Sequence, residues 1–167
     1  MKKVVLSLSV LALFSCGQQT PSAEPTQGEW ITGTDEEQLE KIEDHFQGFG
    51  KAMWEVSYRY KELYSAGKNQ NWGYAEHHVE EMEEAIELGL ERRPKHAEAA
   101  EHFLNVALPN MAKAIEAKDQ DVFFENFEQM RVSCNACHVM REHAFIKVRT
   151  PKDYYSVVGE EESKNED

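Results

Sequence analysis

The sequence predicts an all-α fold, an antiparallel up-down-up-down four-helix bundle over residues 34–150. Apolar residues recur at alternating steps of three and four, which is the period of a helix that buries one face. Short breaks rich in glycine, proline or asparagine separate four such segments. Helices joined by short loops pack as antiparallel neighbours, so we expect a single domain with one modest core.

The first helix is predicted to begin at Thr34, because Thr34 and Glu37 have the spacing of a capping box. Its apolar seam then continues without interruption as far as the break at residues 67–71. The seam consists of Leu39, Ile42, Phe46, Phe49, Met53, Val56, Tyr60 and Leu63.

Asn71 is a candidate N-cap for a second helix over residues 72–92. Pro94 suits the first turn of a third helix. Pro109 is expected to kink or divide that helix, because proline lacks an N–H and crowds the preceding turn.

The fourth helix is predicted to begin after a cap at Asp119 or Asp121. Its core stripe is Phe123, Phe127, Met130, Cys134, Cys137 and Arg141. Residues 145–149 alternate in polarity and precede Pro151, so an extended segment should return over the bundle before an acidic C-terminal tail over residues 151–167.

The N-terminus is typical of an exported bacterial lipoprotein. Residues 1–15 have the basic start and short apolar stretch of a signal peptide, and they precede Cys16, the expected lipidation site. An ordinary cleaved signal with an incidental cysteine is the alternative. Residues 16–33 are predicted to be a flexible tether. We therefore expect a periplasmic or outer-membrane-associated lipoprotein that contacts the membrane through its N-terminal lipid.

The formal net charge of -13 argues against binding to nucleic acid and against adsorption to anionic lipids. Redox partner proteins would then present a basic docking face, although acidic residues can also serve only to solvate helix surfaces. The chain has three cysteines, which one lipid anchor and two covalent attachments would use completely.

The stretch Cys134-Asn135-Ala136-Cys137-His138 has the spacing of a covalent haem-attachment site. Residues three apart share a helix face, so both thiols can form thioethers with one edge of the porphyrin while His138 binds the iron. The motif predicts one covalently bound haem c. A zinc site would need further ligands and a thioredoxin-like dithiol a βαβ context, and neither is visible in the sequence.

Antiparallel geometry estimates which residues surround the haem. Counting from the shared end of the bundle places Phe46, Phe49 and Met53 at the level of Cys137. Met53 is the expected sixth ligand of the iron, with a space-filling core methionine as the alternative. His45 and His96 are weaker candidates. If Phe46 or Phe49 covers the iron, the haem is five-coordinate.

The propionates of a haem need cations or hydrogen-bond donors. Arg141, Lys147 and Arg149 follow the motif, and Arg92, Arg93 and Lys95 are expected at the same end of the bundle. His77, His78 and His102 are interpreted as solvated polar-face residues.

A Cys-x-x-Cys-His motif near the end of the last helix of a bundle resembles the cytochrome c′ family. Cys134, Cys137 and His138 carry the resemblance. That family usually has an aromatic residue three positions and an arginine four positions after the ligand histidine, where this chain has Arg141 and Glu142. The resemblance implies haem c in a four-helix bundle, and such bundles often dimerise through their first two helices.

Three functions are compatible with these patterns. The first is a lipid-anchored electron carrier with His138 and Met53 on the iron. The second is a five-coordinate cytochrome that binds nitric oxide or another diatomic molecule. The third is a helical protein without haem that has a redox-active dithiol at Cys134 and Cys137. No constellation of acid, base and nucleophile predicts an enzyme.

Overall fold

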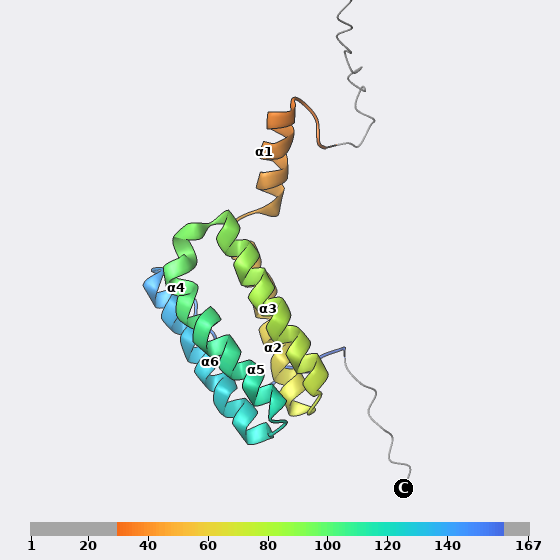
Figure 1. Cartoon of the computed structure of the whole chain (residues 1–167), viewed down its shortest axis with the longest axis vertical. Helices are drawn as coiled ribbons and strands as arrows, with labels where there is room; N and C mark the ends of the chain where they lie inside the picture. The colour runs from red at the N-terminus through yellow and green to blue at the C-terminus, as the bar shows by residue number, and fades with distance from the viewer. Residues whose placement is uncertain (1–29, 159–167) are drawn as a thin grey trace, which may run out of the picture. The chain divides into compact units, whose positions relative to one another are not determined.

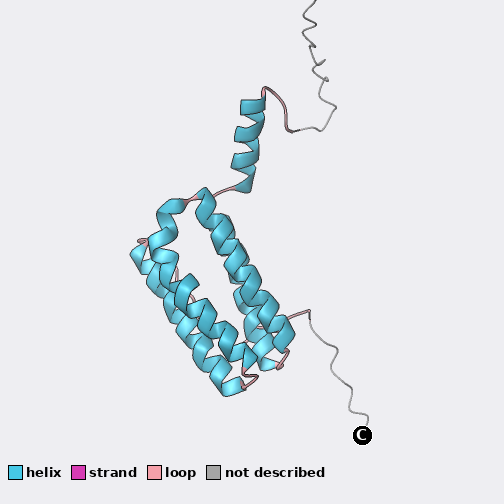
Figure 2. Ribbon diagram, in the orientation of Figure 1, coloured by secondary structure: helices cyan, strands magenta, loops and turns pink. Residues whose placement is uncertain are grey.

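The computed structural model describes residues 30–158, and this part of the chain is helical, without a strand (Figure 2). The expected signal peptide at residues 1–15, the lipidation site Cys16, most of the tether and the last residues of the acidic tail lie outside the described residues. No helix in residues 30–158 combines the length and the apolarity needed to cross a membrane. The chain forms two compact units, divided between Ile42 and Glu43.

The first helix, α1 (Asp35–Phe46), begins at the predicted capping box. The Thr34 backbone N–H donates to Glu37 Oε2 at 2.7 Å, and the Glu37 N–H donates back to Thr34 Oγ1 at 3.4 Å. Lys41 Nζ donates to the carbonyl of Thr32 at 2.6 Å, so the end of the expected tether is bound to the helix.

The expected single first helix is in fact two helices. Gln47 has a left-handed backbone with φ of 60°, and α2 (Phe49–Lys68) starts only after Gly48. Glycine disfavours the helix interior, and α1 contains no buried residue, so no packing energy holds a continuous helix through this point. The N-terminal part of the predicted seam is therefore wrong, and Leu39 is 67% exposed.

α2 packs along α3 (Trp72–Arg92), whose start was predicted correctly. The side chain of Asn71 accepts a hydrogen bond from the Tyr74 N–H at 3.1 Å and caps α3. Gly67, near the end of α2, lets the ring of Phe123 approach the backbone. A Cβ there would lie 2.0 Å from Phe123 Cε1.

The third helical rod is divided, as Pro109 predicts. It consists of a 3₁₀ turn at Pro94–His96, α4 (Ala97–His102), a π-helical turn at Phe103–Ala107 and α5 (Leu108–Glu116). Pro109 lies in the first turn of α5, where its missing N–H costs least. The wider π turn immediately before it accommodates the proline ring without ending the rod.

The last helix, α6 (Gln120–Met140), is capped by Asp119, whose Oδ1 accepts from the N–H groups of Asp121 and Val122. α6 packs against α5 and α2, and α3 against α5 (Figure 1). Half of the predicted core stripe of α6 is buried, at Phe123, Phe127 and Met130, and the other three residues are partly buried.

Four polar residues are buried in the described part of the chain, and two of them, Glu62 and His78, are ionisable. Glu62, 1% exposed, accepts hydrogen bonds from Tyr74, Tyr154 and Ser156. Burial raises the pKa of Glu62, but these three hydrogen bonds outweigh burial and hold the pKa below its usual value. His78 is also 1% exposed, which corrects its interpretation as a solvated surface residue.

Candidate functional site

A cavity of about 860 Å³ lies between α2, α6, the start of the third rod and the segment after α6. This volume is within the range of about 300–1,000 Å³ that is typical of sites for small ligands and cofactors. The structure brings six of the predicted site residues to this one cavity: Phe49, Met53, Cys134, Cys137, His138 and Arg141.

Phe46 is the exception and corrects our estimate of the pocket. It does not line the cavity, and 61% of its surface is exposed. The estimate assumed that Phe46 and Phe49 lie on one continuous helix, whereas the left-handed backbone at Gln47 ends α1 between them. His45, near the same end of α1, is likewise absent from the cavity lining.

One hydrogen bond determines the tautomer of the neutral His138 ring. Its Nδ1 lies 2.8 Å from the backbone oxygen of Ile146. A carbonyl oxygen can only accept, so Nδ1 must carry the proton, and the neutral ring therefore has a free lone pair on Nε2. This is the tautomer in which imidazole binds a metal through Nε2, with the other nitrogen held by a backbone carbonyl.

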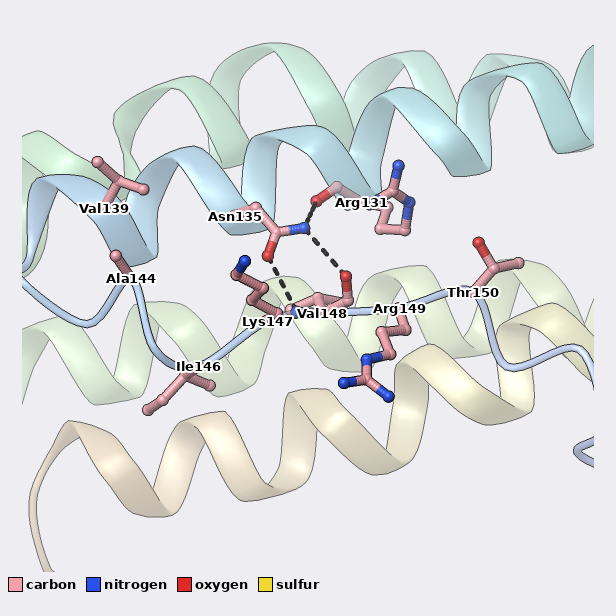
Figure 3. A pocket seen from close by; sticks show the side chains of 9 residues that line it. All are labelled: Arg131, Asn135, Val139, Ala144, Ile146, Lys147, Val148, Arg149 and Thr150. Atoms are coloured by element: carbon pink, nitrogen blue, oxygen red, sulfur yellow. Dashed lines mark hydrogen bonds between the residues drawn. The ribbon is translucent and has the colours of Figure 1, made fainter.

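The segment that supplies this carbonyl is itself fixed to α6. We call residues 145–151 the strap. Asn135, which lies between the two cysteines, binds both backbone groups of Val148, as the two dashed lines between these residues in Figure 3 show. At the far end of the strap, Thr150 Oγ1 donates to Glu128 Oε1 at 2.5 Å. The strap is non-helical and lies over the bundle, as predicted.

The two cysteines are partly buried and are not joined in a disulfide. Burial, followed by the neighbouring Cys137, raises the pKa of the Cys134 thiol to about 12, and burial also raises that of Cys137. Reactive dithiols need a lowered pKa, which a helix N-terminus or a nearby cation supplies. Here both cysteines lie in the C-terminal half of α6.

Across the cavity, α2 contributes Phe49 and Met53. The Phe49 ring stacks on the ring of His96, with 4.5 Å between centroids. His96 Nδ1 is buried without a hydrogen-bond partner. Burial lowers the pKa of His96, and the positive charges of Arg141 and Lys95 lower it further, so its ring is neutral at physiological pH.

Tyr60 also lines the cavity and was predicted only as a seam residue. It is 6% exposed, and its hydroxyl is buried without a hydrogen-bond partner. Burial raises its pKa above the usual value, so the phenol stays protonated and can donate. A buried donor without a partner at a cavity wall fits a ligand that brings an acceptor.

The charged residues of the lining are all of one sign. The chain is strongly acidic, yet the cavity is lined by six lysines and arginines and by no aspartate or glutamate: Lys61, Arg93, Lys95, Arg141, Lys147 and Arg149. Most of the sequence-predicted cations are among them, although Arg92 is not. Such a lining fits an apolar ligand that carries carboxylates.

The residues therefore fit haem c. Two thiols three residues apart and a neighbouring imidazole with a free Nε2 face an apolar cavity with cations at its wall. Within residues 30–158 there is no cluster of three or more His, Cys, Asp or Glu side chains arranged to hold a metal ion by themselves. The sequence did not predict that Asn135 binds the strap or that Lys61 lines the cavity, because both depend on where the strap lies.

No family model matches the chain, and comparisons with curated proteins and with solved structures also give no match. The candidate site therefore rests on the geometry of its own residues.

Proposed function

We propose that the protein is a c-type cytochrome, a lipid-anchored electron carrier whose helices form an up-down-up-down bundle with one covalent haem c on the last helix. The observation that carries this proposal is the convergence of Cys134, Cys137 and His138 on a single cavity lined by apolar side chains and cations. Electron transfer, rather than catalysis, is the proposed role.

The chain's own residues would divide the work as follows. Cys134 and Cys137 would tether the porphyrin, and His138 Nε2 would hold the iron, while the Ile146 carbonyl accepts from Nδ1. Haem c, when bound, supplies an iron that takes up and releases one electron at a time. Met53 is the proposed sixth ligand, because it lines the cavity from α2. The cations of the lining neutralise the propionates.

The strap would contribute by excluding water. It places Ile146 and Val148 on the cavity, where apolar side chains lower the local dielectric and so influence the reduction potential. Hydrogen bonding of His138 by a carbonyl raises the basicity of the imidazole and thereby favours ferric iron.

The two other functions have less support. A five-coordinate gas-binding site was expected to have Phe46 and Phe49 over the iron, but Phe46 is outside the cavity and Phe49 is stacked on His96. A redox-active dithiol would require thiols that ionise readily, whereas burial raises the pKa of both cysteines.

A haem stain of the denatured protein and its optical spectra test the proposal. The full chain, exported with a haem-attachment system, should give a haem-staining band and a low-spin ferrous spectrum that carbon monoxide leaves unchanged. A high-spin spectrum that shifts with carbon monoxide would instead support gas binding. The absence of haem would overturn the proposal and return the chain to the dithiol function.

Two variants separate haem attachment from the lipid anchor. Replacing both Cys134 and Cys137 by serine should abolish the stain. Cys16→Ser should keep the stain but move the protein from the membrane to the periplasmic fraction, since Cys16 is the proposed lipidation site. Membrane retention of Cys16→Ser would contradict the lipid anchor alone.

A homodimer through the first helices of the bundle is a further expectation. Sedimentation of the Cys16→Ser variant would measure it.

A further inference from the structure

The mouth of the cavity is positively charged although the chain as a whole is acidic. The six cations of the lining were named above, and the lining contains no carboxylate to balance them. A second hollow of about 390 Å³ shares the strap with the cavity (Figure 3). Its lining also contains only positive charges, at Arg131, Lys147 and Arg149. Neither lining contains an aspartate or a glutamate, although Glu128 binds Arg131 and Thr150 beside the strap.

Most of these cations have no acidic partner. Among the described residues, Arg131 binds Glu128 at 2.7 Å, and Arg93 approaches Glu43 at 3.9 Å. Residues 30–158 provide no ion-pair partner for the other cations around the strap and the cavity: Lys61, Lys95, Arg141, Lys147 and Arg149. Their charge is thus available to a ligand or to another protein.

A bound haem would not use all of this charge. Its two propionates carry at most two negative charges, and the lining presents six cations. The ferric iron adds positive charge to the site rather than removing it. Because Arg93 is paired with Glu43, a surplus of about three positive charges would remain around the site.

Exposed apolar side chains accompany this surplus. Val139 and Met140 at the end of α6 are 61% and 56% exposed, and Phe145 and Ile146 in the strap are 79% and 49% exposed. Apolar residues surrounded by charged ones are the usual composition of a protein–protein interface. We call residues 139–149 the docking face; its charged side chains are three cations, Arg141, Lys147 and Arg149, and one carboxylate, Glu142.

We propose that the docking face binds an electron-transfer partner through an acidic surface of that partner. This inference rests on the proposed function and names the partner of the same site. The net charge alone would favour a basic partner, but charges more than about 8 Å apart are largely screened at physiological ionic strength. A docked partner therefore responds to the local cations and not to distant carboxylates.

The salt dependence of the electron-transfer rate with small charged redox probes tests whether the docking face attracts negative charge. The ferrous holoprotein passes one electron to hexacyanoferrate(III), giving the ferric protein and hexacyanoferrate(II). Its rate should fall as salt is raised from about 0.1 to 0.5 M, because salt screens the attraction between the docking face and the anion. The rate with the cation hexaammineruthenium(III) should rise. The reverse pair of trends would show that the net charge governs approach and would overturn the proposal.

Reversing the charge of two cations tests whether the attraction of the anionic probe arises at the docking face. Lys147→Glu combined with Arg149→Glu should slow hexacyanoferrate(III) reduction by about tenfold at 0.1 M salt. Lys113→Glu combined with Lys118→Glu makes the same change in net charge at exposed positions outside the cavity lining, and the rate should stay close to that of the parent. Equal slowing in both double variants would overturn the assignment.

A binding measurement separates this inference from the proposed function. The holoprotein should bind immobilised poly-L-glutamate at low salt, and the Lys147 and Arg149 double variant should lose this binding while the control keeps it. A protein without haem would refute the proposed function, yet its binding to poly-L-glutamate would still be measurable. A haem-loaded protein that does not bind poly-L-glutamate would refute only the acidic partner.

Discussion

Asn135 binds Val148 through both of its backbone groups. Asn135 Nδ2 donates to the Val148 carbonyl at 3.0 Å, and the Val148 N–H donates to Asn135 Oδ1 at 2.9 Å. The amide side chain thus takes the place of a neighbouring strand for one residue of the strap. Through this pair, a residue between Cys134 and Cys137 helps to place the strap whose Ile146 carbonyl accepts from His138 Nδ1.

Asn135→Ala should therefore loosen the strap. The loss of one donor and one acceptor leaves two part-buried backbone groups unsatisfied, which we expect to lower the free energy of unfolding by about 1–3 kcal/mol. Urea denaturation measures this change. Asn126→Ala on the same helix is the matched control, because its amide bonds only to the exposed Val122 carbonyl. Equal stability of the two variants would contradict a role for Asn135 in holding the strap.

His138→Ala should leave both thioethers but remove the proximal ligand of the iron. The protein would still stain for haem, and its ferrous Soret band would shift and weaken. His77→Ala is the control, because His77 is half-exposed and does not line the cavity. An unchanged ferrous spectrum in His138→Ala would show that another residue binds the iron.

Met53→Leu keeps the volume and the apolar character of the side chain and removes its sulfur. If Met53 is the sixth ligand, this variant should become high-spin and bind carbon monoxide. His96→Leu is the informative comparison, because His96 lines the same cavity with a buried nitrogen that has no partner. A spin-state change in His96→Leu alone would transfer the ligand role to His96.

Gly67→Ala should destabilise the fold. An added Cβ would overlap the buried ring of Phe123, and we expect the overpacking to lower the free energy of unfolding by about 1–3 kcal/mol. Gly73→Ala is the control, since an added Cβ at this position has no heavy atom within 4 Å apart from its chain neighbours and the backbone of its own helix. It should instead gain up to about 1 kcal/mol from helix propensity. Thermal denaturation that ranks the two variants in the opposite order would contradict this packing.

His78 should make stability depend on pH. Burial, with further contributions from Arg59 and His77, lowers the pKa of His78 from 6.5 to about 4. Between these values the unfolded chain binds the proton and the folded protein does not. The free energy of unfolding therefore keeps the full contribution of His78 above about pH 6.5. It falls as the pH is lowered toward 4, by up to about 1.4 kcal/mol per pH unit.

The variant His78→Leu isolates this effect. Both ring nitrogens of His78 lack hydrogen-bond partners, so an apolar replacement leaves no group unsatisfied. Urea denaturation at several pH values should show a shallower slope for His78→Leu than for the parent protein. His77→Leu, at the exposed neighbouring position, should retain the parent slope, and the reverse result would reject the assignment.

The sequence predicted best those features that depend on a few adjacent residues. The caps at Asn71 and Asp119 and the disruption at Pro109 each follow from local hydrogen bonding or sterics, and the structure has all three. Cys134, Cys137 and His138 share one cavity because their spacing on a helix already places them together.

Features that depend on long-range packing were predicted poorly. The apolar period continues from Phe46 to Phe49, but the left-handed backbone at Gln47 ends α1 and α2 starts only after Gly48. The burial of His78 depends on how α2 and α3 pack, and the role of Asn135 on the path of the strap. Net charge alone did not indicate that cations gather around one cavity, whereas their positions in the sequence predicted all of them except Lys61.

The docking of the strap determines whether the site is closed. Residues 145–151 follow α6 in the chain and form one wall of the cavity. Until Val148 reaches Asn135, the cavity lacks this wall, and His138 lacks the carbonyl that fixes its tautomer. In the proposed cytochrome, haem attachment would therefore be least obstructed before the strap docks, and the contact between Asn135 and Val148 would close the site afterwards.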